Sequence, residues 1–274
     1  LDIVEEEITT RSRASRRGVL FTAVVQGRVT EFLDVDGTAI ALRRQAGGSP
    51  GLVWLGGYRS DMEGTKALYL RERCSERGQA FLRLDYSGHG SSGGRFEDGT
   101  ISQWTRDAAA VIDARAPEEP LILVGSSMGG WIALLLARLW GEERVHGVLG
   151  IAAAPDFTEA LIPQELTEED RLALDQDGVT YRPSDYGEPM PFTAALLEDG
   201  RSNLLLDRPL SYTNPVKLLQ GMRDAEVPWR HALRIVEALE SPAVSLTLVK
   251  DGDHRLAREQ DLALIVATLR ELRG

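Results

Sequence analysis

Several residue types and patterns are scarce in this chain of 274 residues, and each shortage excludes a class of protein. The single cysteine, Cys74, rules out an intramolecular disulfide and a cysteine-rich metal site. No run of about 18 apolar residues occurs, so no membrane-spanning helix is predicted. Basic residues are outnumbered, and the net charge of −11 argues against nucleic acid or an anionic membrane surface as the main partner.

The remaining composition is typical of a soluble globular protein, with 43% hydrophobic and 27% charged residues. This length accommodates one large α/β domain, or a core domain with a small insertion. The first residues are acidic where a secretory signal would be basic and then apolar. The basic run from Arg11 to Arg17 lies too close to these acids for a transit peptide, so we expect a cytoplasmic location.

The alternation of apolar and turn-forming segments predicts an α/β fold. Residues 1–17 have no clear period and are predicted to be a poorly ordered tail. Antiparallel strands are expected on both sides of Asp36-Gly37, which is the signature of a tight hairpin turn. From residue 52 onward strands alternate with helices, which implies parallel strands and right-handed crossovers. The expected strands are 19–25, 31–35, 38–42, 52–55, 80–84, 121–124, 145–153, 216–219 and 244–249. The expected helices are 61–77, 101–114, the run after residue 128 as far as 141, 229–239 and 255–273.

Residues 156–213 interrupt this alternation. Their many prolines and acids, with scattered apolar residues, predict a small and mainly helical insertion. Ligands of open α/β sheets bind over the carboxyl ends of the strands, so an insertion there is expected to act as a lid. The alternative is a long surface excursion without function. The predicted core therefore comprises residues 18–155 and 214–274, with residues 156–213 as the lid.

The strand at 121–124 runs into Gly125-Ser126-Ser127-Met128-Gly129, which matches G-x-S-x-G, and a helical run follows at once. This context predicts a nucleophile elbow that exposes Ser127 above the sheet. A second match, with Ser92 at its centre, has neither a strand before it nor a helix directly after it. Its composition is that of a loop, so Ser127 is the predicted nucleophile and Ser92 is not.

A base and an acid are expected at strand ends after the lid. His254 follows the last predicted strand, whereas His146 precedes its strand, His231 lies within a helix and His89 lies in a glycine-rich turn upstream of the elbow. We therefore predict that His254 is the base. Asp224 is the predicted acid, which would hold the histidine in the correct tautomer.

Other acids lie near these positions and remain alternatives to Asp224, namely Glu226, Asp251 and Asp253. The order Ser127, Asp224, His254 is the order in which this kind of fold carries its triad. The oxyanion hole needs two backbone N–H donors. We predict those of Met128, which follows the nucleophile, and of Tyr58, which follows Gly56-Gly57 in an early strand–helix loop.

Five stretches of the chain resemble a known family. They are 57–67 (GYRSDMEGTKA), 84–92 (LDYSGHGSS), 124–131 (VGSSMGGW), 221–229 (GMRDAEVPW) and 253–255 (DHR). Together they are similar to the α/β-hydrolases, and more closely to the group of mitochondrial acyl-protein thioesterases and acyl-glucuronide esterases with its bacterial relatives. The resemblance implies an α/β-hydrolase fold, with a mostly parallel sheet, an antiparallel edge, helices on both faces and a helical lid. It also implies cleavage of acyl esters or thioesters, with a small molecule or an acylated protein as substrate.

The chain is thus interpreted as a serine hydrolase that works through an acyl-enzyme, with no cofactor or metal. One alternative is hydrolysis of another bond, such as an amide or carbon–carbon bond, on the same fold. A second is a binding module without catalysis, which would have no need of a complete triad. A third is a lipase that acts at interfaces, although no amphipathic anchor is evident. The sequence does not indicate an oligomeric state.

Overall fold

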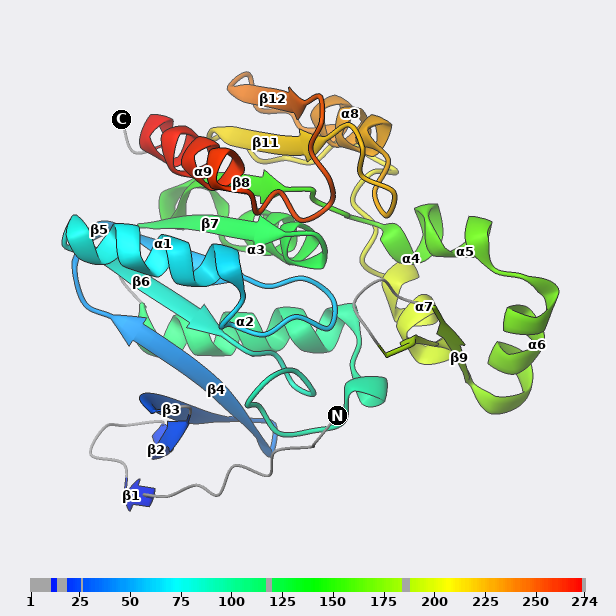
Figure 1. The fold of residues 1–274 in the computed structure, drawn as a ribbon, viewed down its shortest axis with the longest axis horizontal. Helices are drawn as coiled ribbons and strands as arrows, with labels where there is room; N and C mark the ends of the chain where they lie inside the picture. Colours follow the sequence, from blue (N-terminus) through cyan, green and yellow to red (C-terminus); the bar gives the residue numbers. More distant parts are fainter. Residues whose placement is uncertain (1–10, 14–18, 26, 117–119, 184–187, 273–274) are drawn as a thin grey trace.

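The computed structural model describes residues 11–13, 19–25, 27–116, 120–183 and 188–272, and a ten-stranded sheet crosses the molecule (Figure 1). Its strands are β1 (Arg11–Arg13), β2 (Val19–Val25), β3 (Arg28–Val35), β4 (Thr38–Gln45), β5 (Gly48–Leu55), β6 (Gln79–Leu84), β7 (Leu121–Ser126), β8 (Val145–Ile151), β11 (Val216–Gly221) and β12 (Val244–Val249). Their order is β1-β2-β3-β4-β6-β5-β7-β8-β11-β12. The strands from β6 to β12 pair in parallel, and β1 to β4 form an antiparallel extension that joins β6.

The central parallel strands lie between two layers of helices, which explains why β7 is apolar from residue 121 to residue 125. Every residue of β6 and β7 is buried. Helices α1 (Thr65–Glu76) and α9 (Glu259–Glu271) pack on one face. Helices α2 (Ile101–Arg115), α3 (Met128–Arg144) and α8 (Trp229–Ala238) pack on the other. The predicted α/β fold, with its antiparallel edge and helices on both faces, is confirmed.

The antiparallel extension contains the predicted hairpin. Asp36 and Gly37 both have positive φ, 50° and 84°, which the tight turn between β3 and β4 requires. Most of the tail predicted for residues 1–17 lies outside the described residues. Within it, Arg11–Arg13 form β1 and pair with β2, so these three residues belong to the sheet.

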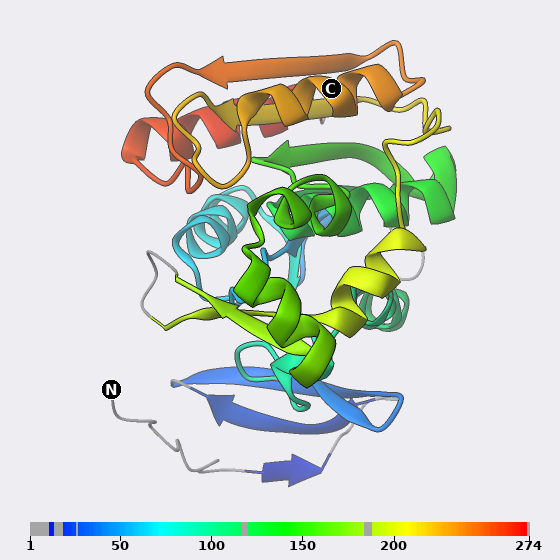
Figure 2. The ribbon, with the colours of Figure 1, turned by 90° about the vertical axis from the view of Figure 1, so that its right-hand side faces the viewer.

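The described part of the insertion predicted at residues 156–213 lies beyond the carboxyl end of β7 (Figure 1) and in front of the sheet in the view of Figure 2. It contains α4 (Phe157–Ala160), α5 (Ile162–Glu165), α6 (Glu168–Asp177) and α7 (Ala194–Arg201). It also contains a two-stranded sheet of β9 (Val179–Arg182) and β10 (Met190–Thr193), which the sequence did not predict. The Asp156 carboxylate accepts the N–H groups of Leu205 and Leu206, both at 2.8 Å, and so joins the beginning of the insertion to its return.

Two helices begin later than predicted. Helix α1 begins at Thr65 rather than at 61, because carboxylates bind the N–H groups of the preceding loop: Asp85 accepts that of Met62 and Asp61 that of Glu63. Helix α9 begins at Glu259 rather than at 255, since Leu256 has a φ of 43° that no α-helix accommodates.

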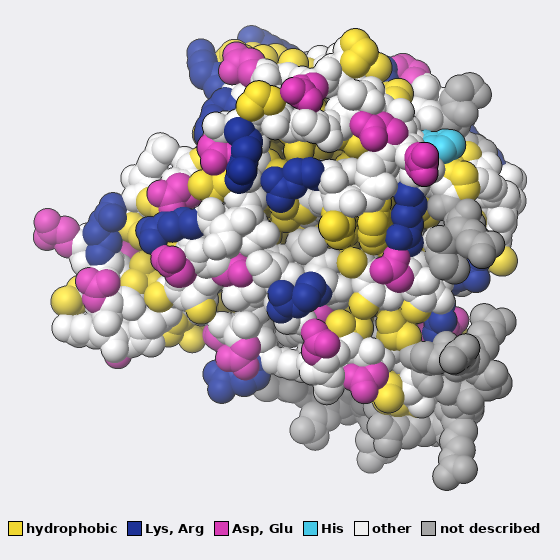
Figure 3. Space-filling model, turned by 180° about the vertical axis from the view of Figure 1, so that it is seen from behind, with side chains coloured by type: hydrophobic (Ala, Val, Ile, Leu, Met, Phe, Trp, Pro, Cys, Tyr) yellow, Lys and Arg dark blue, Asp and Glu magenta, His cyan; other side chains and the backbone are white. Residues whose placement is uncertain are grey.

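The distribution of surface charge and the length of the helices bear on possible partners. Acidic and basic side chains are intermingled over the face seen in Figure 3, so the net charge of −11 does not gather there in one patch. Within the described part of the chain, no helix combines the length and the apolar character needed to cross a bilayer.

Candidate active site

Ser127 occupies a strained turn between β7 and α3. Its φ of 53° and ψ of −120° are rare for a residue with a side chain. Backbone bonds hold the turn in place. The Ser127 N–H donates to the carbonyl of Ile151 at 2.9 Å, and the Ser127 carbonyl accepts the N–H groups of Gly130 and Ala154 at 2.9 and 3.1 Å.

The turn presents the serine side chain and buries its neighbours. Ser127 is the one residue that is not buried between positions 121 and 137, a range that the structure describes throughout. A Cβ on Gly129 would overlap the carbonyl of Leu55, and a Cβ on Gly57 would lie 3.3 Å from that of Ser127. The end of β5 therefore passes directly beside the elbow, and glycine is needed for this approach.

Asp224 and His254 form a hydrogen-bonded pair in the loops after β11 and β12. His254 Nδ1 lies 2.8 Å from Asp224 Oδ2, and the Asp224 side chain is fully buried. A carboxylate accepts, so Nδ1 carries a proton, and in the neutral imidazole Nε2 then holds the lone pair. Asp224 also accepts three further hydrogen bonds, from the N–H groups of Glu226 and Val227 and from the Gln220 amide, at 2.8–2.9 Å.

The structure does not join the serine to the histidine by a hydrogen bond. Among the described residues, the Ser127 hydroxyl has no hydrogen-bond partner, while His254 Nε2 lies 3.6 Å from Glu226 Oε2. Catalytic hydrogen bonds are often long without substrate and tighten when it binds. Ser127, Asp224 and His254 follow the carboxyl ends of the parallel strands β7, β11 and β12. All three therefore lie at the same end of the sheet.

The loops that carry Asp224 and His254 are fastened to each other. The Arg223 N–H donates to the carbonyl of Gly252 at 2.9 Å, and a Cβ on Gly221 would overlap that same carbonyl. From α1, Lys66 Nζ donates to the carbonyl of Arg255, next to the histidine. These contacts fix where the imidazole lies without touching it.

Tyr58, whose N–H is one predicted oxyanion donor, follows Gly57 in the loop beside Ser127. Its ring stacks on Phe192 of the insertion with centroids 5.4 Å apart, and its hydroxyl donates to the carbonyl of Pro191. Burial raises the pKa of the Tyr58 hydroxyl, which keeps it neutral. Met128, the other predicted donor, is the first residue of α3, where backbone N–H groups are free of helical bonds.

The alternative nucleophile, Ser92, is engaged in the fold. Its hydroxyl donates to the carbonyl of Asp85 at 2.6 Å and accepts the N–H of Ala41 at 2.8 Å. Two of the other histidines also lie away from Ser127. His231 is buried in α8, where its Nε2 donates to the carbonyl of Pro155, and His146 is exposed in β8 at the opposite end of the sheet.

Two residues beside His254 and Asp224 have contacts that are not predicted from the sequence. Gln220, which donates to Asp224, lies inside a strand and carries no sequence signal of such a role. The sequence marks Glu226 only as an alternative to Asp224, yet its Oε2 lies 3.6 Å from the other nitrogen of His254. Among the described residues, no group of three or more His, Cys, Asp or Glu side chains is placed to hold a metal ion.

Comparison with known proteins places this chain in a family. A sequence model described as "Serine aminopeptidase, S33" matches residues 57–172. The chain is 37% identical over 237 residues to the mouse protein "Palmitoyl-protein thioesterase ABHD10, mitochondrial", covering 85% of this chain and 78% of the relative. The human protein of the same name is 36% identical over 240 residues, with 85% and 76% covered.

Solved structures agree. A protein from Agrobacterium vitis S4 superposes with a TM-score of 0.84 at 45% identity, covering 89% of this chain and 98% of that one. The mouse α/β-hydrolase domain-containing protein 10 superposes with a TM-score of 0.81 at 35% identity, covering 89% and 97%. This chain belongs to the α/β-hydrolase family. The hydrolase fold and the resemblance to the acyl-protein thioesterase group, both predicted from sequence motifs, are confirmed, and the protein is an enzyme of the hydrolase class.

The predicted location is wrong. The expected cytoplasmic location of this hydrolase is contradicted by its relatives, which are named as mitochondrial proteins. The physical reason is that receptors read a protein's destination from targeting segments, independently of how the core folds. The acidic first residues were therefore a poor guide to location.

Proposed function

We propose that this hydrolase cleaves acyl thioesters and esters through an acyl-enzyme formed on Ser127, with His254 and Asp224 completing the triad. The observation that carries the proposal is the hydrogen bond from His254 Nδ1 to the buried Asp224 carboxylate. It leaves the Nε2 lone pair available as a base, in the order of residues that this fold uses. The thioesterase names of the mouse and human relatives support the choice of bond.

The reaction takes two steps. Ser127 Oγ attacks the acyl carbonyl as His254 Nε2 takes its proton, and the N–H groups of Tyr58 and Met128 stabilise the oxyanion. The bond to the leaving thiol or alcohol breaks, and His254 returns the proton to that group. Water then attacks the acyl-enzyme with His254 again as base, which releases the carboxylic acid and restores Ser127.

Residues 156–213 are proposed to act as the lid of this site. They lie beyond the carboxyl end of β7, which is where ligands of open α/β sheets bind. Two contacts tie them to the loop of the proposed oxyanion donor: the Tyr58 hydroxyl donates to the carbonyl of Pro191, and the Arg59 guanidinium to that of Pro189 at 2.6 Å. An acyl chain would enter beside the apolar rings of Tyr58 and Phe192.

Labelling with a fluorophosphonate probe, read by intact mass, tests the nucleophile. We expect one adduct on the wild type and on Ser92→Ala, and none on Ser127→Ala. We also expect Ser127→Ala to lower turnover by something on the order of a millionfold, as in a comparable triad, without a change in thermal stability. An adduct that persists in Ser127→Ala would overturn the assignment.

A panel of substrates tests which class of bond this enzyme hydrolyses. Acyl thioesters and esters of increasing chain length are expected to turn over, and peptide amides to turn over far more slowly. Faster cleavage of amides would favour the alternative of amide hydrolysis. Absence of both adduct and turnover in the folded wild type would favour a binding module.

A further inference from the structure

His89 lies buried behind the loop that carries Tyr58, in the turn after β6. Its Nδ1 is 3.1 Å from the carbonyl of Ser87, and its Nε2 is 3.2 Å from the backbone nitrogen of Arg59. A carbonyl only accepts and a backbone N–H only donates, so Nδ1 carries the proton and Nε2 holds the lone pair. Burial lowers the pKa of His89 to about 4, which keeps the imidazole neutral at neutral pH.

The N–H that His89 accepts belongs to a strained residue. Arg59 has a φ of 57°, in the left-handed region that side chains disfavour. Such a strained conformation persists only where several surrounding contacts hold the backbone in it. The bond to His89 is one of these contacts, and it fixes the peptide that joins Tyr58 to Arg59.

We propose that His89 is a positioning residue that aims the Tyr58 N–H at the oxyanion. This inference rests on the function proposed above, in which that N–H is a donor. His89 acts through the backbone of Arg59 and needs no contact with substrate. A donor held in place before the reaction stabilises the developing charge without reorganisation, which is why a fixed loop matters for turnover.

The imidazole is itself firmly held. The Ser87 carbonyl that accepts from His89 also accepts the indole N–H of Trp104 at 3.0 Å, and the Ser87 N–H donates to Asp107 at 2.8 Å. The rings of Tyr86, Phe96 and Trp104 meet the imidazole at steep angles, with centroids 4.9–5.4 Å away. His89 is therefore a rigid support, because both its ring plane and its tautomer are determined.

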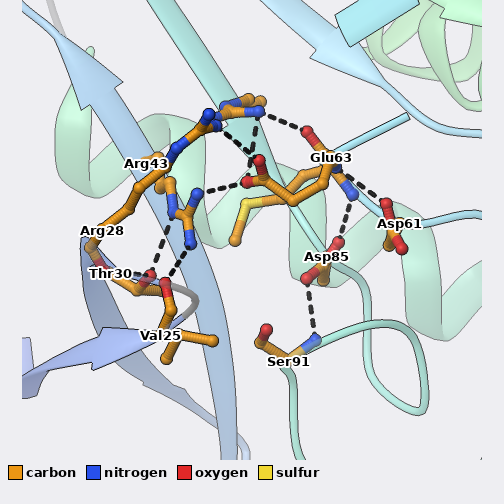
Figure 4. A network of polar contacts seen from close by, with 10 residues as sticks. Val25, Arg28, Thr30, Arg43, Asp61, Glu63, Asp85 and Ser91 are labelled. Atoms are coloured by element: carbon orange, nitrogen blue, oxygen red, sulfur yellow. Dashed lines mark hydrogen bonds and ion pairs between the residues drawn. The ribbon is translucent and has the colours of Figure 1, made fainter. Parts of the chain in front are cut away.

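The far end of the same loop has its own anchor, drawn in Figure 4. Asp85 accepts the N–H of Met62 at 2.6 Å and that of Ser91 at 2.9 Å, and so joins this loop to the turn that contains His89. Glu63 forms ion pairs with three arginines from β3, β4 and β6, namely Arg28, Arg43 and Arg83. Loss of the His89 contact should therefore shift the segment at Tyr58 and Arg59 while the loop remains attached.

Two substitutions at His89 separate positioning from packing. In His89→Asn the amide can replace Nδ1 as donor to Ser87 but does not reach Arg59. In His89→Gln the longer side chain can place an acceptor near the position of Nε2. We expect His89→Asn to lower kcat about 10- to 100-fold with KM within about threefold, and His89→Gln to stay within about fivefold of wild type.

Affinity for a trifluoromethyl ketone, which forms a tetrahedral oxyanion on the serine, should fall in parallel with kcat/KM in His89→Asn. A role in packing alone predicts a different result, in which both variants lose thermal stability and activity together. Equal losses in Asn and Gln, or a loss confined to KM, would overturn the proposal.

Hydrogen exchange at the Arg59 amide supplies a readout without substrate. Protection is expected in the wild type and in His89→Gln, and its loss in His89→Asn. If the wild type hydrolyses no acyl substrate, the proposed function fails while this measurement still decides whether His89 holds the loop. Equal protection in all three proteins would refute the positioning role, whatever the activity.

Discussion

Gly129, in the first turn of α3, faces the end of β5 so closely that no side chain fits between them. Replacing it with alanine would force a Cβ against the carbonyls of Leu55 and Gly56, which are backbone atoms and cannot rotate away. We expect Gly129→Ala to lower the free energy of unfolding by about 1–3 kcal/mol or more. It should also impair activity, since those carbonyls lead into the loop of Tyr58.

Urea denaturation of Gly129→Ala beside Gly48→Ala provides the measurement. A Cβ on Gly48 would meet its nearest atom at 3.7 Å, an ordinary contact, and its φ is not positive. The control should change stability by less than about 1 kcal/mol. Similar effects in the two variants would contradict the close approach.

The two serines that match G-x-S-x-G show what a motif can and cannot predict. Ser127 and Ser92 share the motif, and only the strand before Ser127 and the helix after it distinguish the predicted nucleophile in the sequence. The structure adds the reason why Ser92 is unsuited to attack: its hydroxyl is committed as a donor to Asp85 and as an acceptor from Ala41. Neither partner was visible in the sequence, because they lie 7 and 51 residues away.

Helix α6 of the insertion depends on its first turn. The Thr167 hydroxyl accepts the N–H of Asp170 at 3.1 Å, and the Asp170 carboxylate accepts that of Thr167 at 2.9 Å, which forms a capping box. We expect Thr167→Ala to destabilise this helix by about 1 kcal/mol. The amides at the start of α6 should exchange faster, while the unfolding midpoint of the core changes little.

Thr167→Ser is the matched control, because it keeps the hydroxyl and should preserve exchange protection. If Thr167→Ala lowers the global midpoint as much as it loosens α6, the insertion unfolds together with the core. The result therefore also measures how independent the insertion is.

The long elements of the core were predictable because burial on both faces imposes apolar runs on the central strands, such as residues 121–125 of β7 and 147–151 of β8. Strands β9 and β10 were not predicted. They have four residues each, β10 contains Pro191, and their pairing across the insertion depends on where tertiary packing places them. Short strands of this kind carry little periodicity from which to recognise them.

Stability of the whole molecule should depend on pH through buried groups. The pKa of His89 is lowered to about 4 in the folded protein, against an ordinary value near 6.5. Between these values the unfolded chain binds the proton and the native state does not, so this contribution is complete above about pH 6.5 and is lost as the pH falls towards 4. Burial raises the pKa of Asp85 to about 7, which gives the opposite slope in the same range.

Comparison of the wild type with His89→Gln isolates the histidine, because the Asp85 contribution is common to both. From pH 7 to pH 4.5 we expect the wild type to lose about 2 kcal/mol more stability than the variant, measured by urea denaturation. Parallel pH curves for the two proteins would show that His89 titrates alike in the folded and unfolded states.

The sequence alone determined the α/β-hydrolase fold, and it led to the prediction of a core in two segments, 18–155 and 214–274. It also led to the predictions of Ser127, Asp224 and His254 as triad and of Tyr58 and Met128 as oxyanion donors. These features follow from local patterns, namely apolar strands, glycine turns and polar residues directly after strands. Only the tertiary structure decided that Asp224, rather than Asp251 or Asp253, bonds to His254.

The tertiary structure also decided that His89 accepts the N–H of Arg59, and that β9 and β10 form a sheet. The physical reason is common to these cases. Each depends on groups that are not adjacent in the chain, 30 residues apart in the two histidine contacts, and tertiary packing sets the geometry with which they meet. A pattern in the sequence states which side chains are available at a strand end, whereas the folded molecule determines which of them meet.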